Sequence, residues 1–196
     1  MKRILNFEKH SIILASQSPR RQQLLKDMGL NFEVRTDKDI EELFPENLKE
    51  QEIATYLAEL KFDAYQSGLA ENEILITADT IVCIDGLMLG KPKDKKHAIE
   101  MLECLSGKSH FVYTGITVGN NINKITSYDS SEVFFKKLSS DEIEWYIDTF
   151  KPYDKAGSYG VQEWIGYVGI EKIIGSFYNV MGLPTQKLFD TLKLFV

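Results

Sequence analysis

The stretch SIILASQSPRRQQLLKDMG, residues 11–29, decides the fold class because it joins a strand pattern directly to a helix pattern. Residues 11–15 form a short apolar run that predicts a buried strand. Ser18 stands at the N-cap of a helix, and Pro19 follows at the first helical position, where a missing N–H costs nothing. Gly29 ends the helix, since glycine readily adopts the backbone of a C-terminal cap. A strand that leads through a polar loop into a helix is typical of α/β proteins.

The same alternation of strand and helix patterns continues to the end of the chain. Further strands are predicted at residues 32–36, 73–85, 111–118, 125–137 and 166–175, and the second of these reads as one long strand or a strand pair. Further helices are predicted at residues 48–66, 94–107 and 141–150 and from Pro184 onward. Asp85-Gly86 predicts a hairpin. The sequence therefore predicts an α/β fold with a mixed β-sheet flanked by helices, in one domain spanning residues 1–196.

Charge and composition exclude several classes of protein. The chain has 23 Lys and Arg against 29 Asp and Glu, a formal net charge of -6, which argues against a nucleic-acid polymer as partner. The N-terminal segment, residues 1–16, has only short apolar stretches broken by charge, so it predicts neither a signal peptide nor a membrane span. We therefore expect a cytoplasmic protein. Because the histidines and cysteines lack metal-ligand spacing, any metal is expected on carboxylates, which suits magnesium or manganese.

The junction between the first strand and the first helix is a candidate phosphate site. It holds Ser16, Ser18, Arg20 and Arg21. The first turn of a helix presents unpaired N–H groups and the positive end of the helix dipole, and arginines add charged donors. The same residues also fit a capped helix start with two solvated arginines, so this motif alone leaves both interpretations open.

A second candidate is Asp79, which interrupts the apolar run ILITADTIVCI. A carboxylate inside such a strand is costly without partners and often marks a functional site. Two lysines are further candidates: Lys61 at the edge of a helix stripe, and Lys91, held between glycine and proline before a helix. Taken alone, Lys61 also fits a lysine whose stem covers apolar surface, and Lys91 an ordinary exposed loop lysine. The acidic residues 37–42 fit a solvated loop or a metal ligand. Gln162, in DKAGSYGVQ, carries the donor and the acceptor that base recognition requires.

The order of these motifs resembles the Maf family over nearly the whole chain. The resemblance rests on S-x-S-P-R-R, A-D-T, G-K-P, K-A-G-x-Y-G-x-Q and G-S-x-x-N-V-x-G-L-P, which occur here in that order. It implies a fold related to the inosine-triphosphate pyrophosphatases, with two lobes around a nucleotide cleft. It also implies hydrolysis of a nucleoside triphosphate between its α- and β-phosphates, a divalent metal cation as cofactor and, frequently, a homodimer.

Carried over by position, the resemblance assigns roles to individual residues. Asp79 matches the catalytic proton acceptor, with a role as metal ligand alone as the alternative. The substrate-binding positions are Ser16, Arg20, Arg21, Lys61, Lys91, Thr80 and Gln162. The set of Arg20, Thr80 and Gln162 resembles the branch that acts on dTTP and UTP.

Two departures from the family pattern concern the metal site and one helix. The acidic segment after the second strand is one residue longer than usual, so either Glu41 or Glu42 is its metal-binding acid, and we prefer Glu42 together with Asp79. Phe62 stands where the family usually has alanine. The alternative function is a non-catalytic nucleotide-binding regulator of cell division. Asp79 beside the lysines favours the enzyme, because a binder of anions has no need of a carboxylate there.

Overall fold

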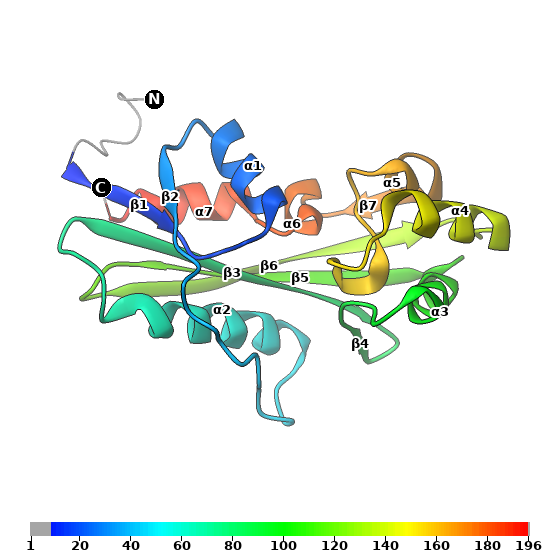
Figure 1. Ribbon diagram of the computed structural model, residues 1–196, viewed down its shortest axis with the longest axis horizontal. Coiled ribbons are helices and arrows are strands. Elements are labelled where there is room, and N and C mark those ends of the chain that lie inside the picture. The colour runs from blue at the N-terminus through cyan, green and yellow to red at the C-terminus, as the bar shows by residue number, and fades with distance from the viewer. Residues whose placement is uncertain (1–8, 196) are drawn as a thin grey trace. The chain divides into compact units, whose positions relative to one another are not determined.

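A computed structural model describes residues 9–195 (Figure 1). These residues form two compact units. Unit 1 comprises the described residues up to Asp79, together with Thr114–Asp129 and the residues from Gly182 onward. Unit 2 comprises Thr80–Tyr113 and Ser130–Met181. None of the helices in the described residues is both long and apolar enough to span a bilayer.

The strands form a seven-stranded sheet in the order β2-β1-β3-β5-β6-β7, with β4 paired to β3. Their bounds are β1 Ser11–Leu14, β2 Phe32–Val34, β3 Glu73–Ile84, β4 Leu87–Leu89, β5 Ser109–Gly119, β6 Lys124–Phe135 and β7 Ile170–Ile174. β1 runs parallel to β2 and β3, whereas the β3–β4 and β6–β7 pairs are antiparallel. The predicted mixed sheet is therefore confirmed, and residues 73–84 form one long strand.

The helices follow the predicted alternation with the strands. They are α1 Pro19–Asp27, α2 Glu50–Gln66, α3 Lys95–Leu105, α4 Ser140–Phe150, the 3-10 turn η2 Ala156–Ser158, α5 Trp164–Gly169, α6 Phe177–Met181 and α7 Thr185–Leu192. The Ser18 side chain caps α1 by accepting a hydrogen bond from the Arg21 N–H. Asp85 and Gly86 have φ of 50° and 78°, the left-handed backbone of a tight hairpin turn. These local signals predicted their elements correctly.

In unit 1, α1 and α7 lie on one face of the sheet and α2 on the other (Figure 1). The core between α2 and the sheet includes Ile13, Leu75 and the fully buried Phe62. A Cβ atom on Gly119 would lie 2.8 Å from the Phe62 ring. The residue that departs from the family pattern thus fills a space that a glycine in β5 leaves open.

Unit 2 has its own core, in which α3 and α4 bury their apolar faces. Leu102 of α3 and Tyr146 and Ile147 of α4 are fully buried there, together with Val133 of β6. The capping box at Ser139 and Glu142 starts α4 as the sequence predicts. The loop that contains Gln162 therefore follows a helix that is packed into this core.

The prediction of a strand over residues 166–175 is wrong in its first half. Residues 164–169 form α5, and only Ile170–Ile174 are extended. Ile165 and Gly169 are the buried residues of α5 and lie four positions apart, which is a helical and not a strand spacing. A Cβ on Gly166 would lie 1.8 Å from the Val161 carbonyl oxygen, so this helix packs closely on the preceding loop. The short helix α6 also follows from no signal in the sequence.

Candidate active site

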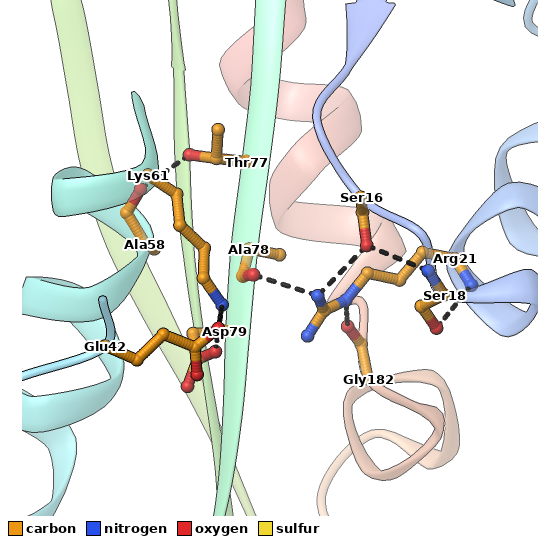
Figure 2. A network of polar contacts seen from close by, with 10 residues as sticks. All are labelled: Ser16, Ser18, Arg21, Glu42, Ala58, Lys61, Thr77, Ala78, Asp79 and Gly182. Atoms are coloured by element: carbon orange, nitrogen blue, oxygen red, sulfur yellow. Dashed lines mark hydrogen bonds and ion pairs between the residues drawn. The ribbon is translucent and has the colours of Figure 1, made fainter. Parts of the chain in front are cut away.

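The candidate active site is built around Asp79, the last residue of unit 1, in the middle of β3. Its Oδ1 atom lies 2.6 Å from Lys61 Nζ (Figure 2). Both side chains are mostly buried, with exposed fractions of 12% for Asp79 and 14% for Lys61. The ion pair supplies the partner that a carboxylate in an apolar strand requires.

Lys61 also contacts a second carboxylate. Its Nζ atom lies 2.8 Å from Glu42 Oε1, and the Glu42 side chain is 48% exposed. Of the two acidic residues that the sequence left open, Glu42 is therefore the one whose carboxylate converges with Asp79 on one ammonium group (Figure 2). The cluster combines one positive and two negative charges.

A hydrogen bond between α2 and β3 fixes the spacing of this cluster. Thr77 Oγ1 donates to the Ala58 carbonyl oxygen over 2.6 Å, and Thr77 is fully buried. Ala58 lies one helical turn before Lys61, and Thr77 lies two residues before Asp79, on the same face of the strand. The bond therefore places the lysine and the carboxylate opposite each other.

Arg21 fastens the first helix to the strand that carries Asp79. Its Nη1 atom donates to the Ala78 carbonyl oxygen over 2.9 Å and to Ser16 Oγ over 3.3 Å, and its Nε atom donates to the Gly182 carbonyl oxygen over 2.8 Å (Figure 2). Burial lowers the pKa of the guanidinium, and the charge of Asp79 opposes that shift. Arg21, expected to bind phosphate, thus holds backbone carbonyl groups in this structure.

The predicted phosphate loop has the geometry of a helix start. Ser16 is buried, and its Oγ atom accepts a hydrogen bond from the Ser18 N–H over 3.3 Å. Arg20 is half-buried in the first turn of α1. This turn offers N–H groups and the positive end of the helix dipole to an anion.

The remaining predicted residues belong to unit 2. Thr80 is half-buried in β3, and Lys91 is exposed in the loop after β4. The Gly90 carbonyl oxygen accepts a hydrogen bond from the Gly157 N–H over 3.1 Å, so the G-K-P and K-A-G-S-Y-G segments lie together. Gln162 is half-buried, and its Oε1 atom accepts no hydrogen bond from the residues that the structure describes.

Sequence reasoning missed several groups that hold these segments in place. The Gly182 carbonyl lies within a motif of the family resemblance, but a backbone acceptor leaves no signal of its own. Tyr146, Lys155 and Glu163 form a polar network around the Gln162 loop. Lys155 and Glu163 flank the glycine-containing loop, and this position in the sequence was the one signal that pointed to them. Tyr146 sits on the apolar face of α4 and looks like an ordinary core residue.

The donor set fits a hard divalent cation. Glu42 and Asp79 present carboxylate oxygens to one cation already, the Lys61 ammonium. Magnesium is commonly held by one or two carboxylates, with water and substrate phosphates as its other ligands. Within residues 9–195 there is no group of three or more His, Cys, Asp or Glu side chains that could hold a metal ion. A two-carboxylate site completed by a phosphate substrate agrees with that finding.

Comparison with known proteins places the whole chain in one group. A family model described as "Maf-like protein" matches residues 11–195. A protein of Bacteroides thetaiotaomicron named dTTP/UTP pyrophosphatase is 50% identical over 188 residues, which cover 96% of this chain and 97% of the relative. A protein of Parabacteroides distasonis with the same name is 50% identical over 191 residues, covering 97% and 98%.

The fold has a counterpart among solved structures. A HAM1 protein from Coxiella burnetii aligns with a TM-score of 0.51 over 94% of this chain and 99% of that chain, at 20% sequence identity. At that identity the likeness concerns the fold alone, and it agrees with the predicted mixed α/β architecture.

Proposed function

The chain belongs to the Maf-like protein family, and we propose that it is a nucleoside triphosphate pyrophosphatase that converts dTTP and UTP to the monophosphate and pyrophosphate. The observation that carries the proposal is the 50% identity, over nearly the full length of both chains, to relatives named dTTP/UTP pyrophosphatase. The cluster of Glu42, Lys61 and Asp79 supplies the charged groups that such a reaction needs.

Phosphate binding is proposed for the start of α1 and for the lysines. A triphosphate carries several negative charges, so its site must supply positive ones. Ser16 and Arg20 at the helix start offer a hydroxyl, a guanidinium and N–H groups. Lys61 and Lys91 offer ammonium groups. Arg21 supports this site by fixing the carbonyl groups of Ala78 and Gly182.

Glu42 and Asp79 are the residues that would hold a magnesium or manganese ion. Such a cation, when bound, supplies positive charge that stabilises the phosphate oxygens as the bond between the α- and β-phosphates breaks. The two carboxylates lie on different segments, one on the loop after β2 and one on β3. Their shared contact with the Lys61 ammonium supports a role for both in holding one cation.

Asp79 is proposed as the group that accepts the proton of the attacking water. The water oxygen bonds to the α-phosphorus, the bond to the bridging oxygen breaks, and pyrophosphate leaves. The proton passes to Asp79 Oδ, since a carboxylate within reach can act as a general base. Lys61, bonded to Oδ1, fixes the orientation of that carboxylate.

Base choice is proposed to depend on Gln162, with Thr80 and Arg20. Uracil and thymine offer an N3–H donor beside an O4 acceptor. One amide side chain can bond to both, because its oxygen accepts and its NH₂ group donates. The buried Gln162 Oε1 atom is an acceptor without a protein donor among the described residues, so a donor from the base would satisfy it. A homodimer, a cytoplasmic location and the absence of a nucleic-acid partner stay predictions.

The test is a panel of nucleoside triphosphates, incubated with the protein and magnesium or manganese, with released pyrophosphate as the readout. We expect UTP and dTTP to have the highest kcat/KM, CTP to be weaker, and ATP and GTP to be poor substrates. Release of orthophosphate with a nucleoside diphosphate would overturn the assignment of the cleaved bond. A preference for a guanine nucleotide would overturn the assignment of the base.

A further inference from the structure

A buried polar network in unit 2 holds the residues on both sides of Gln162, which is proposed to read the base. Tyr146 of α4 is fully buried, and its hydroxyl accepts a hydrogen bond from the Gly160 N–H over 3.0 Å. The same hydroxyl donates to Glu163 Oε2. Gly160 and Glu163 stand on either side of Gln162 in the chain. One side chain therefore holds both ends of the short segment that carries the glutamine.

An ion pair keeps the far end of this network in place. Glu163 Oε1 lies 3.0 Å from Lys155 Nζ, which also lies 2.7 Å from Asp154 Oδ1. The Lys155 and Glu163 side chains are only 8% and 17% exposed. Removing one partner of a pair this deeply buried leaves an uncompensated charge, so the arrangement resists change. Burial and Glu163 both raise the pKa of Tyr146, so its hydroxyl stays a donor.

The glutamine amide and one carboxylate of the network both lie next to Gly160. A Cβ atom on Gly160 would lie 3.0 Å from Gln162 Nε2 and 2.8 Å from Glu163 Cδ. The amide of Gln162 and the carboxylate of Glu163 thus pack side by side against the α-carbon of Gly160. A side chain at this position would displace both groups, and glycine leaves the space that they occupy.

We propose that Tyr146 and Glu163 are positioning residues that fix the Gln162 amide in one orientation, and thereby select uracil and thymine over cytosine. The proposal rests on the function proposed above. Cytosine presents an N4 donor beside an N3 acceptor, the reverse of the uracil pattern. If the amide group of the glutamine can rotate by half a turn, its oxygen and nitrogen exchange places and it can bond to either base. An amide held in one orientation can bond to only one of them.

The experiment compares Tyr146→Phe with wild-type protein by kcat/KM for UTP and for CTP. The substitution keeps the buried ring and removes only the hydroxyl. We expect the UTP-to-CTP ratio to fall roughly tenfold, within the range for one bidentate base contact. Gln162→Ala gives the UTP-to-CTP ratio that is expected when the glutamine no longer contributes to base selection. Tyr167→Phe is the matched control, because Tyr167 lies just past the same loop and is 81% exposed.

A purely structural role for Tyr146 predicts a different result. Partial unfolding lowers kcat/KM for UTP and CTP by the same factor and leaves their ratio unchanged. A ratio within about twofold of wild type in folded Tyr146→Phe protein overturns the proposal. If that variant does not fold, the UTP-to-CTP ratio of Glu163→Gln is measured instead, and a ratio within about twofold of wild type again overturns the proposal. It retains an acceptor for the Tyr146 hydroxyl but loses the charge that pairs with Lys155.

A second readout separates this proposal from the function on which it rests. The side-chain NH₂ group of Gln162 in ¹⁵N-labelled protein, assigned by its loss in Gln162→Ala, reports its own mobility through the heteronuclear NOE. We expect a rigid amide in wild-type protein and a mobile one in Tyr146→Phe. An unchanged NOE overturns the positioning role even where no nucleotide is cleaved. Wild-type protein that cleaves neither UTP nor dTTP overturns the proposed function alone.

Discussion

Lys61 and Lys155 each lie between two carboxylates, and the two clusters differ in the other contacts that hold them. In unit 1, Lys61 pairs with Asp79 and with Glu42, whose side chain is 48% exposed. In unit 2, Lys155 pairs with Asp154 and Glu163, and the buried Tyr146 hydroxyl binds the second oxygen of Glu163. The charges are the same in number and sign.

The difference lies in how readily a partner can be exchanged. Glu42 stands on a loop without regular secondary structure and is reached by solvent, so its bond to Lys61 can be replaced by one to a metal or a phosphate. Glu163 is bonded on both oxygens within a protein core. The same three charges therefore suit chemistry in unit 1 and fixed geometry in unit 2.

The largest expected effect is on turnover, in Asp79→Asn. The change keeps the size of the side chain and removes the charge that is proposed to accept a proton. Loss of a general base lowers kcat on the order of a hundred- to ten-thousand-fold. Asp154→Asn is the matched change in the other cluster, and we expect it to keep kcat within about threefold, because the Asp154 side chain is 55% exposed and the Lys155–Glu163 pair remains.

Pyrophosphate release under saturating UTP, with circular dichroism as the check on folding, measures both variants. Near-normal turnover by folded Asp79→Asn protein would exclude Asp79 as the proton acceptor. A large loss in Asp154→Asn would instead mean that the second cluster takes part in turnover, and the contrast between the clusters would be broken.

The next prediction measures how strongly the interior of unit 2 disfavours charge. His110 is buried, and its Nε2 atom lies 2.7 Å from the Tyr159 hydroxyl oxygen. Desolvation lowers the pKa of His110 from 6.5 to about 4. Between these values the unfolded chain binds more protons than the folded one. The stability due to neutral His110 is thus complete above pH 6.5 and is lost as the pH falls toward 4, by about 3 kcal/mol at most.

Urea unfolding at pH 7, 6, 5 and 4.5 checks this dependence against His110→Gln, which retains a polar partner for Tyr159. The carboxyl groups of Glu73 and Glu142, whose pKa values are lowered by Arg35 and Lys136, titrate in both proteins and cancel in the difference. Wild type should lose more unfolding free energy than the variant on acidification. If the unfolding free energies of wild type and His110→Gln fall in parallel with pH, the interior of unit 2 tolerates a charged imidazole.

How much of this could be predicted from the sequence depends on the distance over which each signal acts. The cap at Ser18, the hairpin turn and the carboxylate in an apolar strand are local patterns, and the structure has them where the sequence placed them. The preference for Glu42 over Glu41 was made from the sequence, whereas the ion pair of Glu42 with Lys61 joins two elements far apart in the chain and could not be predicted. Arg20 and Arg21 are neighbours in one motif. Which of them bonds the carbonyl groups of Ala78 and Gly182 depends on how α1 is oriented against β3, and the sequence does not give that orientation.

The smallest expected effect concerns Lys61, which occupies the place between the two carboxylates that would hold the metal. Removing its charge in Lys61→Met keeps the length of the side chain and leaves Glu42 and Asp79 without a cation. A divalent ion then binds without displacing a resident ammonium, so the affinity for manganese alone should rise about fivefold, as expected for an ion pair worth ~1 kcal/mol. Turnover should fall in the same variant, because the triphosphate loses a positive partner. Manganese binding followed by electron paramagnetic resonance without nucleotide measures the first effect, and Lys155→Met, in the cluster that holds no proposed metal ligand, should leave that affinity unchanged. A weaker affinity in Lys61→Met would mean that the lysine helps to assemble the metal site and does not compete for it.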